Sequence, residues 1–158
     1  MAANAAVTLL CLGFLAGFFL VLSFLEKPIR PIMAAPHEMR EHESDVRWTH
    51  SQLQAFVKYI GVNSLVPITL IAFIATLGQT YFHRFEVMSV IVAGGVGVLF
   101  LVSFFHASNV MRSVRDTSAY EEDLANVSSS LFRLVRLHNG MFMAIIPLTL
   151  AQLFLLFV

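Results

Sequence analysis

Four long apolar runs, separated by polar segments, dominate the hydrophobic pattern of the chain. Each run reaches the roughly 20 residues that a helix needs to cross a bilayer. We therefore predict an all-α integral membrane four-helix bundle. It forms a single transmembrane domain over 1–158, with helices at approximately 5–26, 46–78, 86–112 and 119–157.

The second and fourth helices are predicted to extend beyond the bilayer at one end of the bundle. Residues 46–58 mix charged and polar side chains with apolar ones before the second apolar run begins. Ahead of the fourth run, Ser118 and Glu121 fit a capping box, and apolar residues recur at helical spacing from Leu124. The fourth helix is therefore expected to begin near Ala119, outside the membrane.

Small residues suggest where helices approach closely. Gly13 and Gly17 lie four residues apart in the first run, and Ala93 and Gly97 do so in the third. Such pairs let the backbone of a neighbouring helix come near, which suggests close helix approach. For Gly13 and Gly17, ordinary packing in a Phe-rich helix is the competing interpretation.

The composition agrees with a membrane protein. Hydrophobic residues make up 58% of the chain and charged residues only 13%, against about 25% charged residues in soluble domains. The formal net charge is zero, so no basic surface favours nucleic acid as a partner. The lipid bilayer is the predicted partner.

Basic residues are divided unequally between the two faces of the membrane. The segments after the first and third helices, which share one face, carry nine Lys and Arg residues, whereas the opposite face carries only Arg84. The positive-inside rule therefore places both larger loops inside and both termini on the outer side, whether periplasmic, lumenal or intermembrane.

The same inner face gathers polar side chains that could form a site. His106, Asn109 and Arg112 are spaced three apart at the end of the third run, which stacks them on one helix face. Four helix ends meet at this face, and they also bring Glu26, His50, Arg136, His138 and Asn139. We interpret this inner mouth as the candidate site. Interfacial side chains that merely reach toward headgroups are the competing interpretation.

Several short segments resemble one family of membrane proteins. The run Gly13–Gly17 with Leu22–Arg30, the exit Ser108–Arg112 and the entry Phe132–Asn139 are similar to the corresponding parts of the anthrone-oxygenase-like family. These are small four-helix membrane proteins, mostly of unassigned function. The family's acidic residue followed by proline matches Glu26 and Pro28.

The resemblance implies oxidation of an anthrone, a tricyclic aromatic polyketide, to its quinone by molecular oxygen. That chemistry needs no metal or flavin, because the anthrone anion itself reacts with oxygen, and we predict neither a cofactor nor a metal. On this basis the catalytic residues would be His106 or, second, His138 as general base, with Asn109 and Arg112 beside them. Substrate binding would fall to Glu26, His50, Arg136 and Asn139.

Two alternatives stay open. The first is a non-catalytic accessory or assembly subunit, in which the amphipathic stretch from Ala119 to Leu137 docks another membrane subunit or a second copy of the chain. The second is a haem or metal carrier that uses His50, His106 or His138, since imidazole binds iron and copper readily.

Overall fold

The protein is described by a computed structural model over residues 2–34, 39–59 and 61–157, and within these ranges every regular element is a helix. The elements are α1 (Ala2–Leu25), α2 (Ile29–Ala34), α3 (Glu43–Tyr59), α4 (Gly61–Phe82), α5 (Val87–Leu101), the π-helix η2 (Val102–Ala107), α6 (Ser108–Asp116) and α7 (Leu124–Phe157). The all-α prediction is confirmed.

Four helical stretches are long and apolar enough to cross a membrane. They are Ala3–Leu25, Ser64–Phe82, Val87–Asp116 and Leu124–Leu156. At 1.5 Å per residue, the 34 residues of α7 extend roughly 50 Å, well beyond a hydrocarbon core of about 30 Å. The chain is therefore a small integral membrane protein whose last helix continues past its membrane span.

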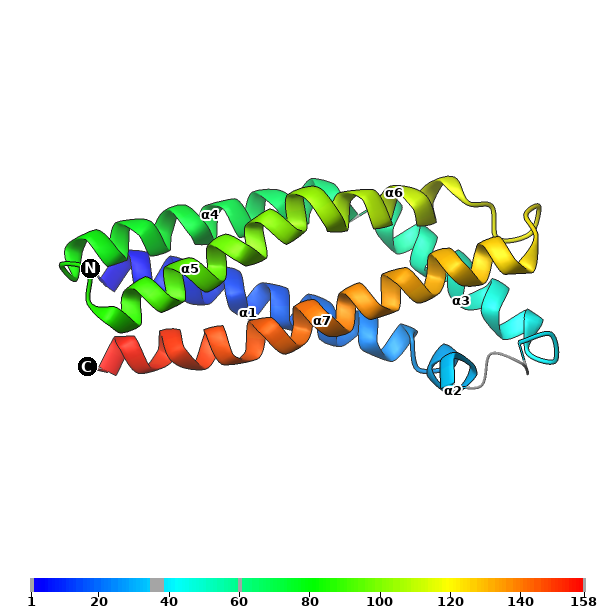
Figure 1. Cartoon of the computed structure of the whole chain (residues 1–158), viewed down its shortest axis with the longest axis horizontal. Coiled ribbons are helices and arrows are strands. Elements are labelled where there is room, and N and C mark those ends of the chain that lie inside the picture. The colour runs from blue at the N-terminus through cyan, green and yellow to red at the C-terminus, as the bar shows by residue number, and fades with distance from the viewer. Residues whose placement is uncertain (1, 35–38, 60, 158) are drawn as a thin grey trace.

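The four spans form a closed ring. Helix α1 packs against α4 and α7, and α5 packs against the same two helices from the other side. Both termini and the α4–α5 turn lie at one end of the bundle, and α2, α3 and the α6–α7 connection lie at the other (Figure 1). We call the latter the polar end, because nine of the ten Lys and Arg residues belong to the segments that meet there.

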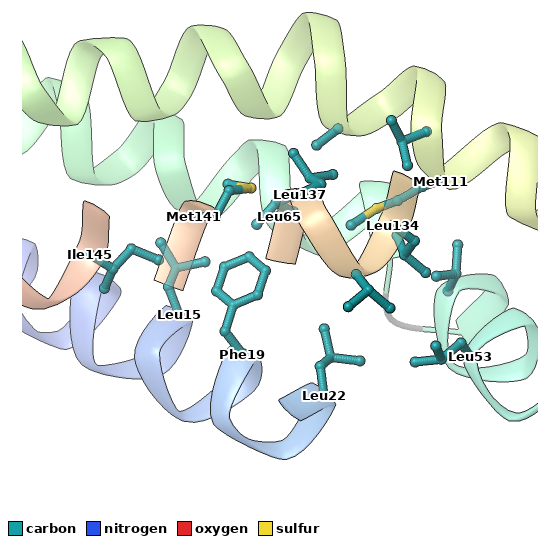
Figure 2. Packing of buried hydrophobic residues seen from close by; sticks show 14 of the residues in the cluster. Leu15, Phe19, Leu22, Leu53, Leu65, Met111, Leu134, Leu137, Met141 and Ile145 are labelled. Carbon is teal, nitrogen blue, oxygen red and sulfur yellow. The ribbon is translucent and has the colours of Figure 1, made fainter. Parts of the chain in front are cut away.

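A continuous apolar core joins the membrane bundle to the polar end. Phe19 and Leu22 of α1 face Met141 and Leu134 of α7, and all four are buried (Figure 2). Beyond them the core continues to buried Leu53, which α3 contributes. The apolar side of α3 is thereby fixed against α6 and α7.

The second predicted helix, 46–78, is two helices in the structure, α3 and α4. Ile60, between them, lies outside the described residues. The division coincides with a change in composition, because α3 carries charged residues and buries one face through Val46, Leu53 and Val57, whereas α4 contains no charged residue. An amphipathic helix that packs on α6 and α7 thus precedes a membrane span.

The fourth helix begins at Leu124 rather than near Ala119. The Ser118 hydroxyl does accept the amide of Glu121 at 3.3 Å, but this bond closes a turn instead of opening the helix. The guanidinium of Arg47 donates to the carbonyl oxygens of Ala119 and Glu122. These carbonyls are therefore directed at α3, and α7 starts only after them.

The two small-residue pairs have different outcomes. In α5, a Cβ on Gly97 would lie 2.9 Å from the Phe73 ring, so the predicted close approach is confirmed there. In α1, no atom lies within 4 Å of a Cβ placed on Gly13 or Gly17. These two glycines face outward, because α1 packs on α4 and α7 through the faces that carry Leu12, Leu15 and Phe19.

Candidate functional site

A π-helical turn shapes the third span where it reaches the polar end. The helix predicted over 86–112 runs on to Asp116, and η2 interrupts its α-helical pattern at Val102–Ala107. The Ser103 carbonyl accepts both the backbone amide of Ser108 and its hydroxyl, the latter at 3.1 Å, which satisfies the widened turn. Single π-turns inside α-helices are frequent at functional sites. Here the turn contains His106.

A groove lies beside this turn, between η2–α6 and α7, and we call it the polar groove. Its volume is about 510 Å³, within the range of small-molecule sites. Its polar lining consists of His106, Asn109, Ser113, Arg133 and Arg136. Three of the predicted site residues, His106, Asn109 and Arg136, are thus brought together from two separate helices.

Arg133 and Ser113 are the lining residues that the sequence interpretation did not select. Arg133 and Arg136 are three residues apart on α7, a spacing that places both on one helix face. That spacing was a usable signal, since it predicts that the two guanidinium groups lie side by side. Ser113 follows Asn109 by four residues in α6, so the same kind of spacing also predicts these two on one face.

The polar groove carries the positive charge of Arg133 and Arg136. Two other arginines at the polar end do form salt bridges, Arg47 with Glu43 and Arg115 with Asp116. Within the described part of the chain, neither Arg133 nor Arg136 takes part in a salt bridge, and both are exposed. The groove therefore favours an anionic group.

An apolar groove continues from the polar one into the membrane-spanning part. Its volume is about 250 Å³, and its lining is almost entirely apolar, from α5, η2 and α7. Arg136 and Leu137 line both grooves, so the two adjoin. Gly140, one turn further along α7, also lines the apolar groove, and no atom lies within 4 Å of a Cβ placed on it. The missing side chain of Gly140 helps to keep the space open.

Arg112, predicted to act beside His106, lines a different groove. This second groove, of about 530 Å³, lies between α4 and η2–α6 and is bordered by Pro67, Phe104 and Phe105. Asn109 borders both this groove and the polar groove. The three residues therefore do not border one common groove: His106 borders the polar groove, Arg112 borders the second groove, and Asn109 borders both.

His138 and Glu26, both predicted site residues, form a buried pair away from the grooves. Their side chains are 2% and 0% exposed, and His138 Nδ1 is hydrogen-bonded to Glu26 Oε1. The Phe19 ring covers the imidazole, with a centroid separation of 5.6 Å. Glu26 Oε2 and His138 Nε2 have no hydrogen-bond partner among the described residues. The pair ties the end of α1 to α7 inside the core.

Asn139 is tied to the chain beside that pair. Its Oδ1 accepts a hydrogen bond from Arg30 Nη2 at 3.3 Å, and the same nitrogen donates to the Ser23 hydroxyl. Arg30 thereby bridges α1, α2 and α7 at the surface. Asn139 does not line any of the grooves given above.

His50 is buried in α3 and serves the packing of α3 on α7. Its Nε2 lies 3.1 Å from Ser130 Oγ. Ser130 donates its own proton to the Val127 carbonyl, so His50 Nε2 must carry the hydrogen of this contact. Nδ1 has no described partner. Burial lowers the pKa of His50, which keeps the ring neutral.

The histidines considered for haem or metal have three different surroundings. His106 is exposed in the polar groove, His138 faces Glu26, and His50 faces Ser130. Within the described ranges, no three His, Cys, Asp or Glu side chains converge on a point that could hold a metal ion.

Comparison with known proteins found no matching family model, no matching curated protein and no matching solved structure. Fold and site together define the class: an all-α integral membrane protein with an amphipathic groove between its third and fourth spans.

Proposed function

We propose that the protein is a small membrane oxygenase that acts on an apolar aromatic substrate in the polar groove and the apolar groove beside it. The main support for this proposal is that the polar groove and the apolar groove adjoin. Arg136 and Leu137 line both grooves. The polar groove, with one imidazole, one amide and two guanidinium groups, therefore lies next to the apolar groove. The anthrone-oxygenase-like resemblance of the sequence supports the same reaction.

The proposed reaction converts an anthrone and one molecule of oxygen into an anthraquinone and one molecule of water. His106 removes a proton from the methylene carbon opposite the ketone, which leaves a delocalised anion. The anion reduces oxygen and forms a carbon–oxygen bond, giving a hydroperoxide after protonation. Loss of water from the hydroperoxide then forms the second carbonyl group, with His106 moving the proton.

The remaining groove residues have roles that follow from their charge and place. Arg133 and Arg136 stabilise the negative charge that develops on the substrate oxygen, and Asn109 orients its hydroxyl groups. In this proposal Arg112 lies on the other face of η2–α6 and takes no part in the reaction. The Glu26–His138 pair, Asn139 and His50 hold the helices in place.

Purified protein in lipid nanodiscs tests the proposal. We expect anthrone-dependent oxygen uptake with a matching rise in quinone absorbance, and His106→Ala should abolish both. His83→Ala is the control, since His83 lies in the α4–α5 turn at the opposite end of the bundle. Turnover at the wild-type rate in His106→Ala, or no quinone from the wild type, would reject the oxygenase.

For the accessory-subunit alternative, the amphipathic stretch Ala119–Leu137 was one candidate docking surface. Val127, Leu131 and Leu134 of that stretch are buried inside the chain itself. That surface is thus already occupied, which favours the oxygenase over a docking role. Co-purification of a second membrane protein in fixed ratio from mild detergent would reverse this preference.

We also propose that the polar end faces the inner side of the membrane, as the distribution of basic residues implies. A membrane-impermeant thiol reagent applied to cells that express Cys11→Ala variants tests the orientation. Arg84→Cys, at the end that carries the termini, should react at once, whereas Arg40→Cys at the polar end should react only after permeabilisation. The reverse pattern would invert the topology.

A further inference from the structure

The polar groove combines an uncompensated positive charge with a position at the end of a membrane span. Arg133 and Arg136 are exposed and have no salt bridge among the described residues. Lone interfacial arginines on a smooth helix contact headgroups transiently. Here two guanidinium groups share one concave surface with the Asn109 amide and the Ser113 hydroxyl. Such a surface can hold a phosphate through several hydrogen bonds at once.

The apolar groove supplies what an acyl chain would need directly below that surface. Its lining comes from Gly95, Val98 and Leu99 on one side and from Gly140, Met141 and Ala144 on the other. Val98 is 61% exposed, so the groove opens sideways onto the lipid.

We propose that an anionic phospholipid occupies these adjoining grooves in the membrane. Its phosphate lies between Arg133 and Arg136 at the polar groove, and one acyl chain lies along Gly140 in the apolar groove. This site goes beyond the proposed function, because the lipid would fill the grooves when substrate is absent and would compete with it when present. The charge selects an anionic headgroup over a zwitterionic one, since a choline or ethanolamine cation would meet two arginines.

Native mass spectrometry of protein from nanodiscs tests the site. The discs contain phosphatidylcholine with one part in ten of phosphatidylglycerol. The wild type should retain one phosphatidylglycerol molecule after mild delipidation. Arg133→Gln/Arg136→Gln should lose it, with an affinity lower by roughly thirty-fold, which corresponds to about 2 kcal/mol for two basic side chains at 1.4 kcal/mol per tenfold.

The matched control removes the same charge from the same end of the molecule. Lys27 and Arg40 are both exposed there and line none of the grooves described above. Lys27→Gln/Arg40→Gln should retain the lipid. Equal loss in the control variant would mean that net charge alone attracts the lipid, and the site would be rejected. Retention of phosphatidylcholine in equal amount would also reject it, as would displacement by inorganic phosphate at the lipid's concentration.

A second pair of variants tests the apolar half without altering charge. Gly140→Leu should fill the apolar groove and expel the acyl chain, whereas Gly13→Leu adds the same side chain to an outward-facing position with equal free space. Lipid retained in Gly140→Leu, or lost equally from both variants, would overturn the assignment. Turnover is measured separately in pure phosphatidylcholine, so an inactive protein that still retains phosphatidylglycerol rejects the oxygenase and leaves the lipid site standing.

Discussion

His106 and His138 lie near the same end of the molecule but in opposite environments. His138 is buried and hydrogen-bonded to Glu26, with Phe19 against its ring. His106 is exposed in the polar groove, and its side chain forms no salt bridge or hydrogen bond with the described residues. A buried, partnered polar group holds a fold together, whereas an accessible one is free to meet a ligand. The polar end thus contains two groups of polar residues. The structural set is the buried pair Glu26 and His138, and the candidate functional set is His106 with the other polar residues of the polar groove.

The largest expected effect comes from breaking the buried pair. Glu26→Leu leaves His138 with no partner inside the core, and removing one member of such a pair typically costs about 3–5 kcal/mol. We expect a correspondingly large fall in the free energy of unfolding, measured by thermal denaturation in detergent.

The double variant Glu26→Leu/His138→Leu provides the control for this prediction. Both polar groups are then replaced by apolar ones, so no uncompensated group stays in the core, and stability should recover above that of the single variant. A double variant that is as unstable as the sum of two single variants would show that the pair has no coupling.

Substitutions at two glycines compare the filled interior, at Gly97, with the open groove, at Gly140. Gly97→Leu forces its side chain against the Phe73 ring, which is itself stacked on Phe100 with centroids 6.0 Å apart. Overpacking of this kind costs about 1–3 kcal/mol. Gly140→Leu meets open space and replaces a poor helix former, so we expect unchanged or slightly raised stability. Equal losses in both variants would mean that the groove is closed in the membrane.

The pH dependence of unfolding tests the buried His50. Its folded pKa is lowered by burial, so the unfolded chain takes up a proton first as pH falls below about 6.5. Stability from this group is therefore full above that pH and is lost below it, by at most about 1.4 kcal/mol per pH unit for one group. His50→Gln should flatten the slope of Tm between pH 7 and 5, and an unchanged slope in this variant would contradict the contribution of His50.

Much of the fold was predictable because apolar runs of membrane length have few alternatives. The polar end was harder for a physical reason. Its elements are decided by tertiary contacts, such as the hydrogen bonds from Arg47 that keep Ala119 and Glu122 out of α7. The local sequence pattern does not predict such contacts between residues far apart in the chain.

The candidate site was predicted in part for the same reason. Spacing predicted that His106, Asn109 and Arg112 share one helix face, whereas His106 borders the polar groove and Arg112 borders the groove between α4 and η2–α6. Likewise, Glu26 and His138 were expected near each other. Whether their side chains face a cavity or the core depends on which side of α7 packs against α1, and this packing could not be predicted from the sequence.

The smallest expected effect on stability is that of His106→Ala, and it sharpens the comparison most. The side chain is exposed and lies outside the core, so the free energy of unfolding should change by no more than about 0.5 kcal/mol. His138→Ala, measured alongside, should lose several times more, because it leaves Glu26 buried without its partner. A strong destabilisation by His106→Ala would place His106 in the structural set and remove the main support for a site in the polar groove. Unchanged stability together with lost turnover would separate the two histidines by role as clearly as the structure separates them by burial.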